Sequence, residues 1–151
     1  MRENEIITGD CVEQMMAMPK GSVDLCVCDP PYNLGVAYDQ YHDRLERKTY
    51  TDWAYNWLRH ATLLLKPNGS IFVAINDEYV ADYKQHLDSL GLTMRNWIIW
   101  YYTFGTYATK KFGRDHTHIL YYVNNPKSFT FNADAIRIPS MRQEKLSLIH
   151  I

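Results

Sequence analysis

A strand pattern that runs straight into two prolines sets the strongest limit on the fold. The segment Val23–Cys28, apolar except for Asp24, has the length of a strand, and Pro30 and Pro31 cannot continue its hydrogen-bond ladder. The run Ser70–Ile75 is unbroken, which is typical of a parallel strand covered on both faces. A long amphipathic helix pattern lies between the two. We therefore expect an α/β fold with a mostly parallel sheet and helices on both faces.

The remaining pattern continues this alternation. Asp10 is positioned to cap one helix, a Thr49-x-x-Asp52 capping box to open the long one, and Asn76 or Asp77 to cap a third. Gly91 stands where a left-handed helix end is expected. The expected strands span residues 5–8, 23–28, 70–75, 92–102 and 118–123, and the expected helices begin after the three caps.

Charge and composition exclude several classes of protein. The 151 residues carry 16 Lys and Arg against 17 Asp and Glu, so a basic field over the whole molecule is absent and any nucleic-acid contact needs a local patch. No run approaches the length of a membrane span. Three cysteines form no disulfide framework, which favours the reducing cytoplasm. Cys26-x-Cys28 and His116-x-His118 lack further ligands nearby, so we predict no metal site.

The chemistry is expected at the turn Asp29-Pro30-Pro31-Tyr32, directly after a strand. Proline has no backbone N–H, so this stiff turn presents a carboxylate and carbonyls without competing donors, beside an aromatic ring. Acceptors next to a stacking surface suit a planar heterocycle that bears an exocyclic amino group. A purely structural turn is the alternative interpretation of these four residues.

These residues resemble the DNA amino-methyltransferases whose signature is Asp-Pro-Pro-Tyr, in the permuted order called the beta class. The resemblance extends over nearly the whole chain. It includes Gly9-Asp10-Cys11 before the signature, Ser22–Leu25 leading into it, Trp57–Ser70 after it, and the segments Ile98–Tyr101 and His116–Tyr122. It implies a Rossmann-like sheet that uses S-adenosylmethionine to methylate a base in DNA.

The resemblance also implies roles for individual residues. Asp29 and the carbonyl of Pro30 would accept the two N–H bonds of the target amine, with Pro31 stiffening the turn and Tyr32 stacking on the base. Asp10 and Cys11 would lie against the adenine of the cofactor, together with Asp29. For Asp10, an ordinary helix cap and cofactor binding are compatible.

Double-stranded DNA with a flipped target base is the implied partner. Asn33, Lys110, Lys111 and Arg114 are the predicted DNA contacts, although a solvated turn explains the three basic residues equally well. The long loop from Asn33 to Lys48 is either a lid or a plain loop. The resemblance leaves room for a cognate restriction endonuclease and a bacterial or phage origin, and it does not indicate an oligomeric state.

One part of the family pattern is missing. The family binds S-adenosylmethionine chiefly through a Phe-x-Gly-x-Gly turn, and no Gly-x-Gly occurs in this chain. We therefore predict that residues 1–145 form a partial catalytic domain without the cofactor-binding strands, inactive alone, and that residues 146–151 are a non-native tail. Aspartate at the first signature position favours adenine N6 as the target. Cytosine N4 is one alternative, and an inactive remnant that only binds DNA or a partner is another.

Overall fold

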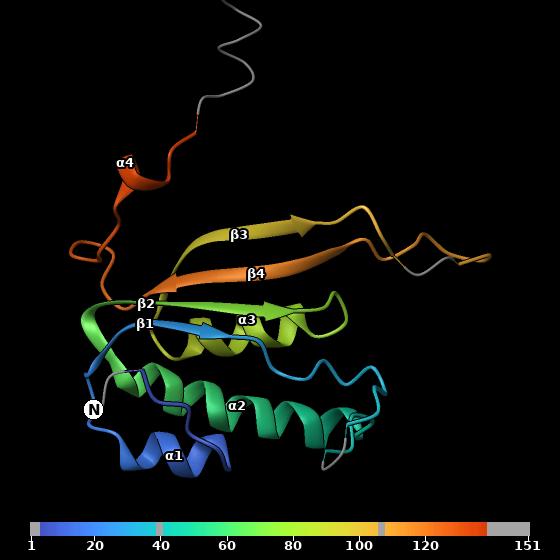
Figure 1. Ribbon diagram of the computed structural model, residues 1–151, viewed down its shortest axis with the longest axis horizontal. Coiled ribbons are helices and arrows are strands. Elements are labelled where there is room, and N and C mark those ends of the chain that lie inside the picture. Colours follow the sequence, from blue (N-terminus) through green and yellow to red (C-terminus); the bar gives the residue numbers. More distant parts are fainter. Residues whose placement is uncertain (1–3, 39–40, 106–107, 139–151) are drawn as a thin grey trace, which may run out of the picture.

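A computed structural model describes residues 4–38, 41–105 and 108–138 of the chain. Four strands form one sheet in the order β1-β2-β4-β3 (Figure 1). The elements in chain order are α1 (Cys11–Ala17), β1 (Val23–Cys28), α2 (Arg47–Leu64), β2 (Leu65–Ile75), α3 (Val80–Ser89), β3 (Thr93–Tyr101), β4 (His116–Val123) and α4 (Ala133–Ile136).

The α/β class is confirmed, but this sheet is mixed rather than mostly parallel. Strand β1 pairs with β2 in parallel, whereas β2 with β4 and β3 with β4 are antiparallel pairs. The reason lies in the connections. Helix α2 carries the chain back across the sheet between β1 and β2, while β3 and β4 are joined by a hairpin, which imposes the opposite direction.

The core lies on one face of this sheet. Ile71, Val73 and Ile75 alternate along β2 and are fully buried, and Leu120 and Tyr122 of β4 join them. Helices α2 and α3 contact these two strands and each other. On the opposite face of the described strands the expected helix layer is absent, and Leu25 and Val27 of β1 are 55% and 73% exposed. The segment that follows β4 leads away from the sheet toward α4 (Figure 1).

The N-terminal strand expected at residues 5–8 does not form. Residues 5–8 have no regular secondary structure, and Ile6 is 93% exposed. The following helix begins as expected, because the Oδ1 atom of Asp10 accepts hydrogen bonds from the backbone N–H groups of Val12 at 2.9 Å and Glu13 at 3.0 Å.

Helix α2 has the predicted apolar face, with Ala54, Trp57 and Leu58 buried against the sheet. Its predicted capping box is wrong. The helix begins three residues earlier, and the carboxylate of Glu46 caps it by accepting from the N–H of Thr49. The sequence rule missed this cap because glutamate is not among the usual N-cap residues.

The end of α3 agrees with expectation, but the predicted cap of this helix is wrong. Tyr79 is the N-cap and makes no side-chain capping bond, while the Oδ1 atom of Asn76 accepts from the N–H of Tyr79 in the turn that precedes the helix. Gly91 follows the helix with φ of +80°, in the left-handed region that glycine reaches without strain. No helix in the part of the chain that the structure describes has the length and apolar character needed to cross a membrane.

Candidate active site

The Asp29–Tyr32 turn lies at the carboxyl end of β1, beside the carboxyl end of its parallel neighbour β2. These sheet edges are where ligands of α/β proteins bind. The two strand ends are joined directly, because the side-chain amide of Asn76, the first residue after β2, donates to the carbonyl of Tyr32 at 3.3 Å. The sheet therefore positions the turn from two strands at once.

Helix α2 holds the same turn from the core side. The hydroxyl of Tyr50 donates to the carbonyl of Pro31 at 2.7 Å and lies 3.0 Å from the hydroxyl of Tyr83. Both tyrosines are fully buried. Burial raises the pKa of Tyr50 above its usual range, so its hydroxyl keeps the proton that it donates. The carbonyls of Pro31 and Tyr32 are thus both engaged within the protein.

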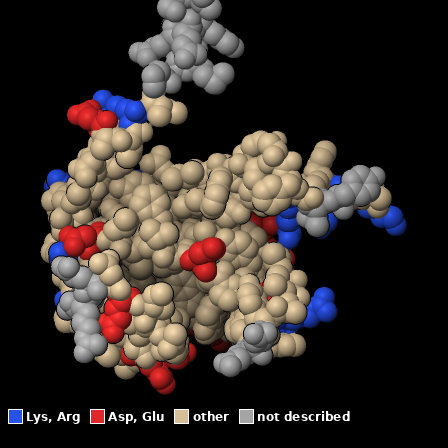
Figure 2. All heavy atoms as spheres, viewed as in Figure 1, with Lys and Arg blue, Asp and Glu red and all other residues tan. Residues whose placement is uncertain are grey.

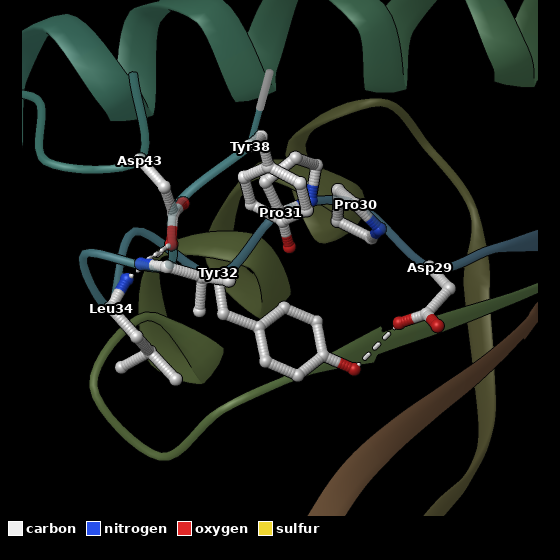
Figure 3. A pocket seen from close by; sticks show the side chains of 8 residues that line it. Asp29, Pro30, Pro31, Tyr32, Leu34, Tyr38 and Asp43 are labelled. Carbon is white, nitrogen blue, oxygen red and sulfur yellow. Dashed lines mark hydrogen bonds between the residues drawn. The ribbon is translucent and has the colours of Figure 1, made fainter. Parts of the chain in front are cut away.

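The Asp29 carboxylate is open to solvent at this edge. Its Oδ1 atom accepts a hydrogen bond of 2.7 Å from the hydroxyl of Tyr32 (Figure 3). Burial, and then this hydrogen bond, raise the pKa of the Tyr32 phenol far above its ordinary value, so the phenol is the donor. Among the described residues no cation pairs with Asp29, which leaves its carboxylate available to a ligand.

A buried aspartate that sequence reasoning missed organises the loop after the turn. Asp43 is 3% exposed, and its two carboxylate oxygens accept from the backbone N–H groups of Asn33 at 2.8 Å, Leu34 at 3.0 Å and Val36 at 3.0 Å (Figure 3). These partners lie seven to ten residues away, outside the reach of any short capping pattern. The carboxylate therefore fixes the backbone that forms one wall of the site.

Asn33, a predicted DNA contact, is occupied within the protein. Its amide nitrogen donates to the carbonyl of Leu45 at 2.9 Å and to the hydroxyl of Tyr79 at 2.8 Å, and its amide oxygen accepts from the N–H of Leu45 at 2.7 Å. The loop is consequently tied to α3 and to the start of α2, which favours the plain loop over the lid. The DNA contact of Asn33 stays a prediction.

Three hollows of about 300 Å³ meet at the turn. The target-side hollow has Asp29, Pro30, Tyr32 and the loop after them as its walls (Figure 3). The aromatic hollow also borders Tyr32 and is closed by residues such as Tyr102 and Phe104. The apolar hollow, between α1, β1 and α2, is lined by Cys11, Met15, Cys26, Cys28, Asp29, Pro30, Pro31, Trp53, Trp57 and Ala61.

The predicted basic DNA contacts lie on the hairpin between β3 and β4. Lys110 and Lys111 are exposed where the hairpin extends beyond the sheet, and Lys and Arg atoms mark this end of the molecule (Figure 2). Arg114 is partly engaged, because its Nε atom lies 3.0 Å from a carboxylate oxygen of Asp77. The structure thus places two freely exposed lysines, and one paired arginine, on the side of the molecule that carries the turn.

Comparison with known proteins decides the family. The DNA methylase family N6_N4_Mtase matches residues 23–150, which include the turn, the hairpin and most of the residues that line the hollows. This chain belongs to the N6/N4 DNA methylases. It is 35% identical over 138 residues to the type II methyltransferase M.HpaI of Haemophilus parainfluenzae, a match that covers 91% of the chain and 44% of the relative. It is 30% identical over 145 residues to the DNA adenine methyltransferase YhdJ of Escherichia coli K12, covering 95% and 49%.

Solved structures confirm the methyltransferase fold. The M1.HpyAVI–SAM complex superposes with a TM-score of 0.63 at 15% identity, over 87% of this chain and 61% of that one. The cytosine-N4-specific PvuII DNA methyltransferase gives 0.63 at 13% identity, over 95% and 61%. The chain thus spans less than half the length of the two relatives above, and about three fifths of these solved chains.

The methylase chain contains part of a site that fits S-adenosylmethionine. Cys11 and Asp29, two residues predicted to bind it, do line one hollow together, and the exposed carboxylate of Asp10 caps the helix at its edge. Apolar walls from Trp53 and Trp57 suit a purine and a thioether chain. The glycine turn that the family uses for the rest of the cofactor has no counterpart in this sequence.

The predicted non-native tail, residues 146–151, lies outside the described residues, and the division at residue 145 stays a prediction.

Proposed function

We propose that this chain carries the base-binding and methyl-accepting side of a DNA methyltransferase that modifies the N6 atom of adenine in double-stranded DNA. One observation carries the proposal. The carbonyls of Pro31 and Tyr32 are held by Tyr50 and Asn76, whereas within the described residues no hydrogen bond engages the carbonyl of Pro30. With the exposed Asp29 carboxylate, of which Tyr32 engages only the Oδ1 atom, this carbonyl forms a pair of available acceptors on a rigid turn, which matches the two N–H bonds of an exocyclic amine.

The pair of acceptors explains how the amine reacts. The amine nitrogen is a poor nucleophile because its lone pair is delocalised into the ring. Hydrogen bonds to Asp29 and to the Pro30 carbonyl draw both N–H bonds to one side and free the lone pair for attack. The nitrogen gains positive charge during transfer, and the Asp29 carboxylate stabilises that charge from a fixed position.

Tyr32 provides the surface on which the base is held. Its ring borders both the target-side hollow and the aromatic hollow, so a base stacked on it reaches the two acceptors and meets a second aromatic wall at Phe104. Extrusion of a base from the duplex costs a few kcal/mol. Stacking contributes about 1–3 kcal/mol per base and offsets part of that cost.

S-adenosylmethionine, when bound, supplies an electrophilic methyl group, and Asp10, Cys11 and Asp29 are the residues of this chain that would hold it. Because the glycine turn is missing, we propose that the 151 residues alone bind the cofactor very weakly and turn over negligibly. Calorimetric titration of the chain with the cofactor tests this directly. Tight binding would contradict this proposal.

The function is tested in a hybrid methylase in which this chain replaces the matching stretch of M.HpaI. The hybrid is incubated with radiolabelled S-adenosylmethionine and duplex DNA, which is then digested to nucleosides. We expect N6-methyladenine. N4-methylcytosine would support the alternative target, which one solved neighbour has. A folded hybrid that binds cofactor and DNA but forms neither product would support the inactive remnant. A cognate restriction endonuclease stays a prediction that this assay does not address.

A further inference from the structure

Two cysteines of strand β1 line the apolar hollow with their thiols side by side. Cys26 and Cys28 are two residues apart, so their side chains share one face of the strand. Their Sγ atoms are 3.4 Å apart, and both side chains are partly buried. The third cysteine, Cys11, lines the same hollow from α1 but is exposed. The methyl-transfer chemistry proposed above uses neither thiol of the pair.

The number of ligands limits what this pair can hold. In the described part of the chain, no group of three or more His, Cys, Asp or Glu side chains is arranged to bind a metal ion. The pair therefore offers two sulfur ligands, which is too few for a closed tetrahedral zinc site. The remaining candidates are soft metal or metalloid atoms that prefer sulfur ligands and can exchange two of their own ligands for the two cysteine sulfurs.

The distance between the sulfurs selects among those centres. If each sulfur bonds to the bound atom at about 2.3 Å, a linear S–atom–S arrangement would place the two sulfurs about 4.6 Å apart. The observed 3.4 Å instead corresponds to an angle of about 95° at the bound atom for the same bond length. Trivalent arsenic has such bent geometry, because its lone pair compresses its bond angles toward a right angle.

We propose that Cys26 and Cys28 form a dithiol site for one trivalent arsenic centre that carries an aryl group. The aryl group accounts for the third bond of the arsenic and would lie in the hollow of about 300 Å³ against Met15, Trp53 and Trp57. Those apolar walls favour an aryl arsenical over inorganic arsenite, which keeps a polar hydroxyl when only two thiols bind it. The two thiols take no part in the proposed methyl transfer, but the hollow that the aryl group would fill is also the one proposed for the cofactor.

The binding step is balanced without an oxidant. An aryl arsine oxide and two thiols give a cyclic dithioarsenite and one water: two As–S bonds form, the As–O double bond and two S–H bonds break, and arsenic stays trivalent. The hydrogen bond from Cys28 lowers the pKa of Cys26, while that bond and burial raise the pKa of Cys28. Cys26 consequently attacks first, and the proton of Cys28 leaves with the water.

Phenylarsine oxide tests the proposal on the 151-residue chain as it is. Intact mass spectrometry is expected to show one phenylarsenic adduct per chain, released by a small dithiol but not by a monothiol at the same thiol concentration. Cys26→Ser and Cys28→Ser should each weaken binding about 10²–10⁴-fold, because the second bond is then no longer intramolecular. The matched variant Cys11→Ser should bind as the parent does, and arsenite should bind more weakly than phenylarsine oxide.

Alkylation of the parent chain gives a second test that needs no variant to fold. With phenylarsine oxide bound, iodoacetamide should label Cys11 and spare Cys26 and Cys28, as read by peptide mass mapping. Loss of the adduct in Cys11→Ser, an adduct that survives either serine variant unchanged, or labelling of Cys26 and Cys28 in the complex would each overturn the proposal.

Discussion

The turn at Asp29–Tyr32 and the outer end of the β3–β4 hairpin lie on the same side of the molecule but are built in opposite ways. Buried polar groups from α2, from the residue after β2 and from the following loop hold the turn. The outer hairpin projects beyond the helices, with Phe104 76% exposed and Phe112 98% exposed (Figure 1). A hydrogen bond between Tyr102 and Asp115 joins its two legs, and Arg114 pairs with Asp77 outside the hairpin.

This difference fits the proposed role of each region. In the proposed reaction a small amine must find its acceptors at fixed positions, so preorganisation at the turn would lower the barrier to reaction. A DNA backbone is long and charged, and exposed lysines adapt to it at little cost. Even so, the legs of the hairpin approach closely: a Cβ atom at Gly105 would collide with the carbonyl oxygen of Arg114, so this position requires glycine.

The largest expected effect is on turnover when the turn loses its charge. In the hybrid methylase, Asp29→Ala should lower turnover about 10²–10³-fold, as expected for loss of one preorganised electrostatic partner. DNA affinity should stay near that of the parent. The matched control is Asp24→Ala, on the same strand, where the carboxylate is exposed and pairs with Lys66. Equal turnover of the Asp29 variant and the control would remove the role assigned to Asp29.

The next effect concerns the anchor of the loop. Asp43→Ala should lower the free energy of unfolding of the 151-residue chain by about 2–4 kcal/mol, because three backbone N–H groups lose a buried charged acceptor. Urea unfolding followed by circular dichroism measures it. Asp115→Ala serves as the control on the hairpin, with an expected change within about 0.5 kcal/mol. Similar losses in both variants would show that the loop is no better anchored than the hairpin.

A smaller effect is expected from the exposed lysines, and it should be confined to DNA binding. In the hybrid, the double variant Lys110→Ala and Lys111→Ala should reduce the slope of log affinity against log salt by about 0.9 for each DNA phosphate that a lysine no longer neutralises. The unfolding midpoint should not move. Lys127→Ala, an exposed lysine beyond the other end of β4, is the charge-matched control. A slope unchanged from that of the parent would mean that the hairpin does not meet the DNA backbone.

The smallest expected effect is a pH dependence at the base of the hairpin. Burial, and then the neighbouring His116, lower the pKa of His118, whose Nδ1 atom accepts from the indole N–H of Trp97 at 3.0 Å. As the pH falls, the unfolded chain therefore binds the proton before the folded chain does. The stabilisation that neutral His118 gives the folded chain is complete above the ordinary histidine pKa of about 6.5 and is lost as the pH falls through it. His118→Asn, which keeps an acceptor for Trp97, should flatten that part of the stability profile. An unchanged profile would show that His118 is not the source of this pH dependence of stability.

Much of the site was readable from local sequence. Asp10 as a helix cap, the apolar face of α2 and the proline turn after β1 depend on residues within one or two helical turns of each other, and short patterns report such relations well. Sheet direction did not follow from the apolar runs. Because the antiparallel strand β4 is apolar too, composition could not distinguish it from a parallel neighbour.

What the amino-acid sequence determined by itself was therefore the chemistry at the turn: a carboxylate, a carbonyl without a competing donor and an aromatic ring, placed together by covalent connection. Only the tertiary structure decided which of these groups remain free. Tyr50 and Asn76 occupy two carbonyls, Asp43 holds the loop, and Asp77 pairs with Arg114, each across more residues than a short sequence pattern spans. The physical reason is that a hydrogen bond depends on distance in space, and folding alone brings groups so far apart in sequence within 3 Å or so of each other.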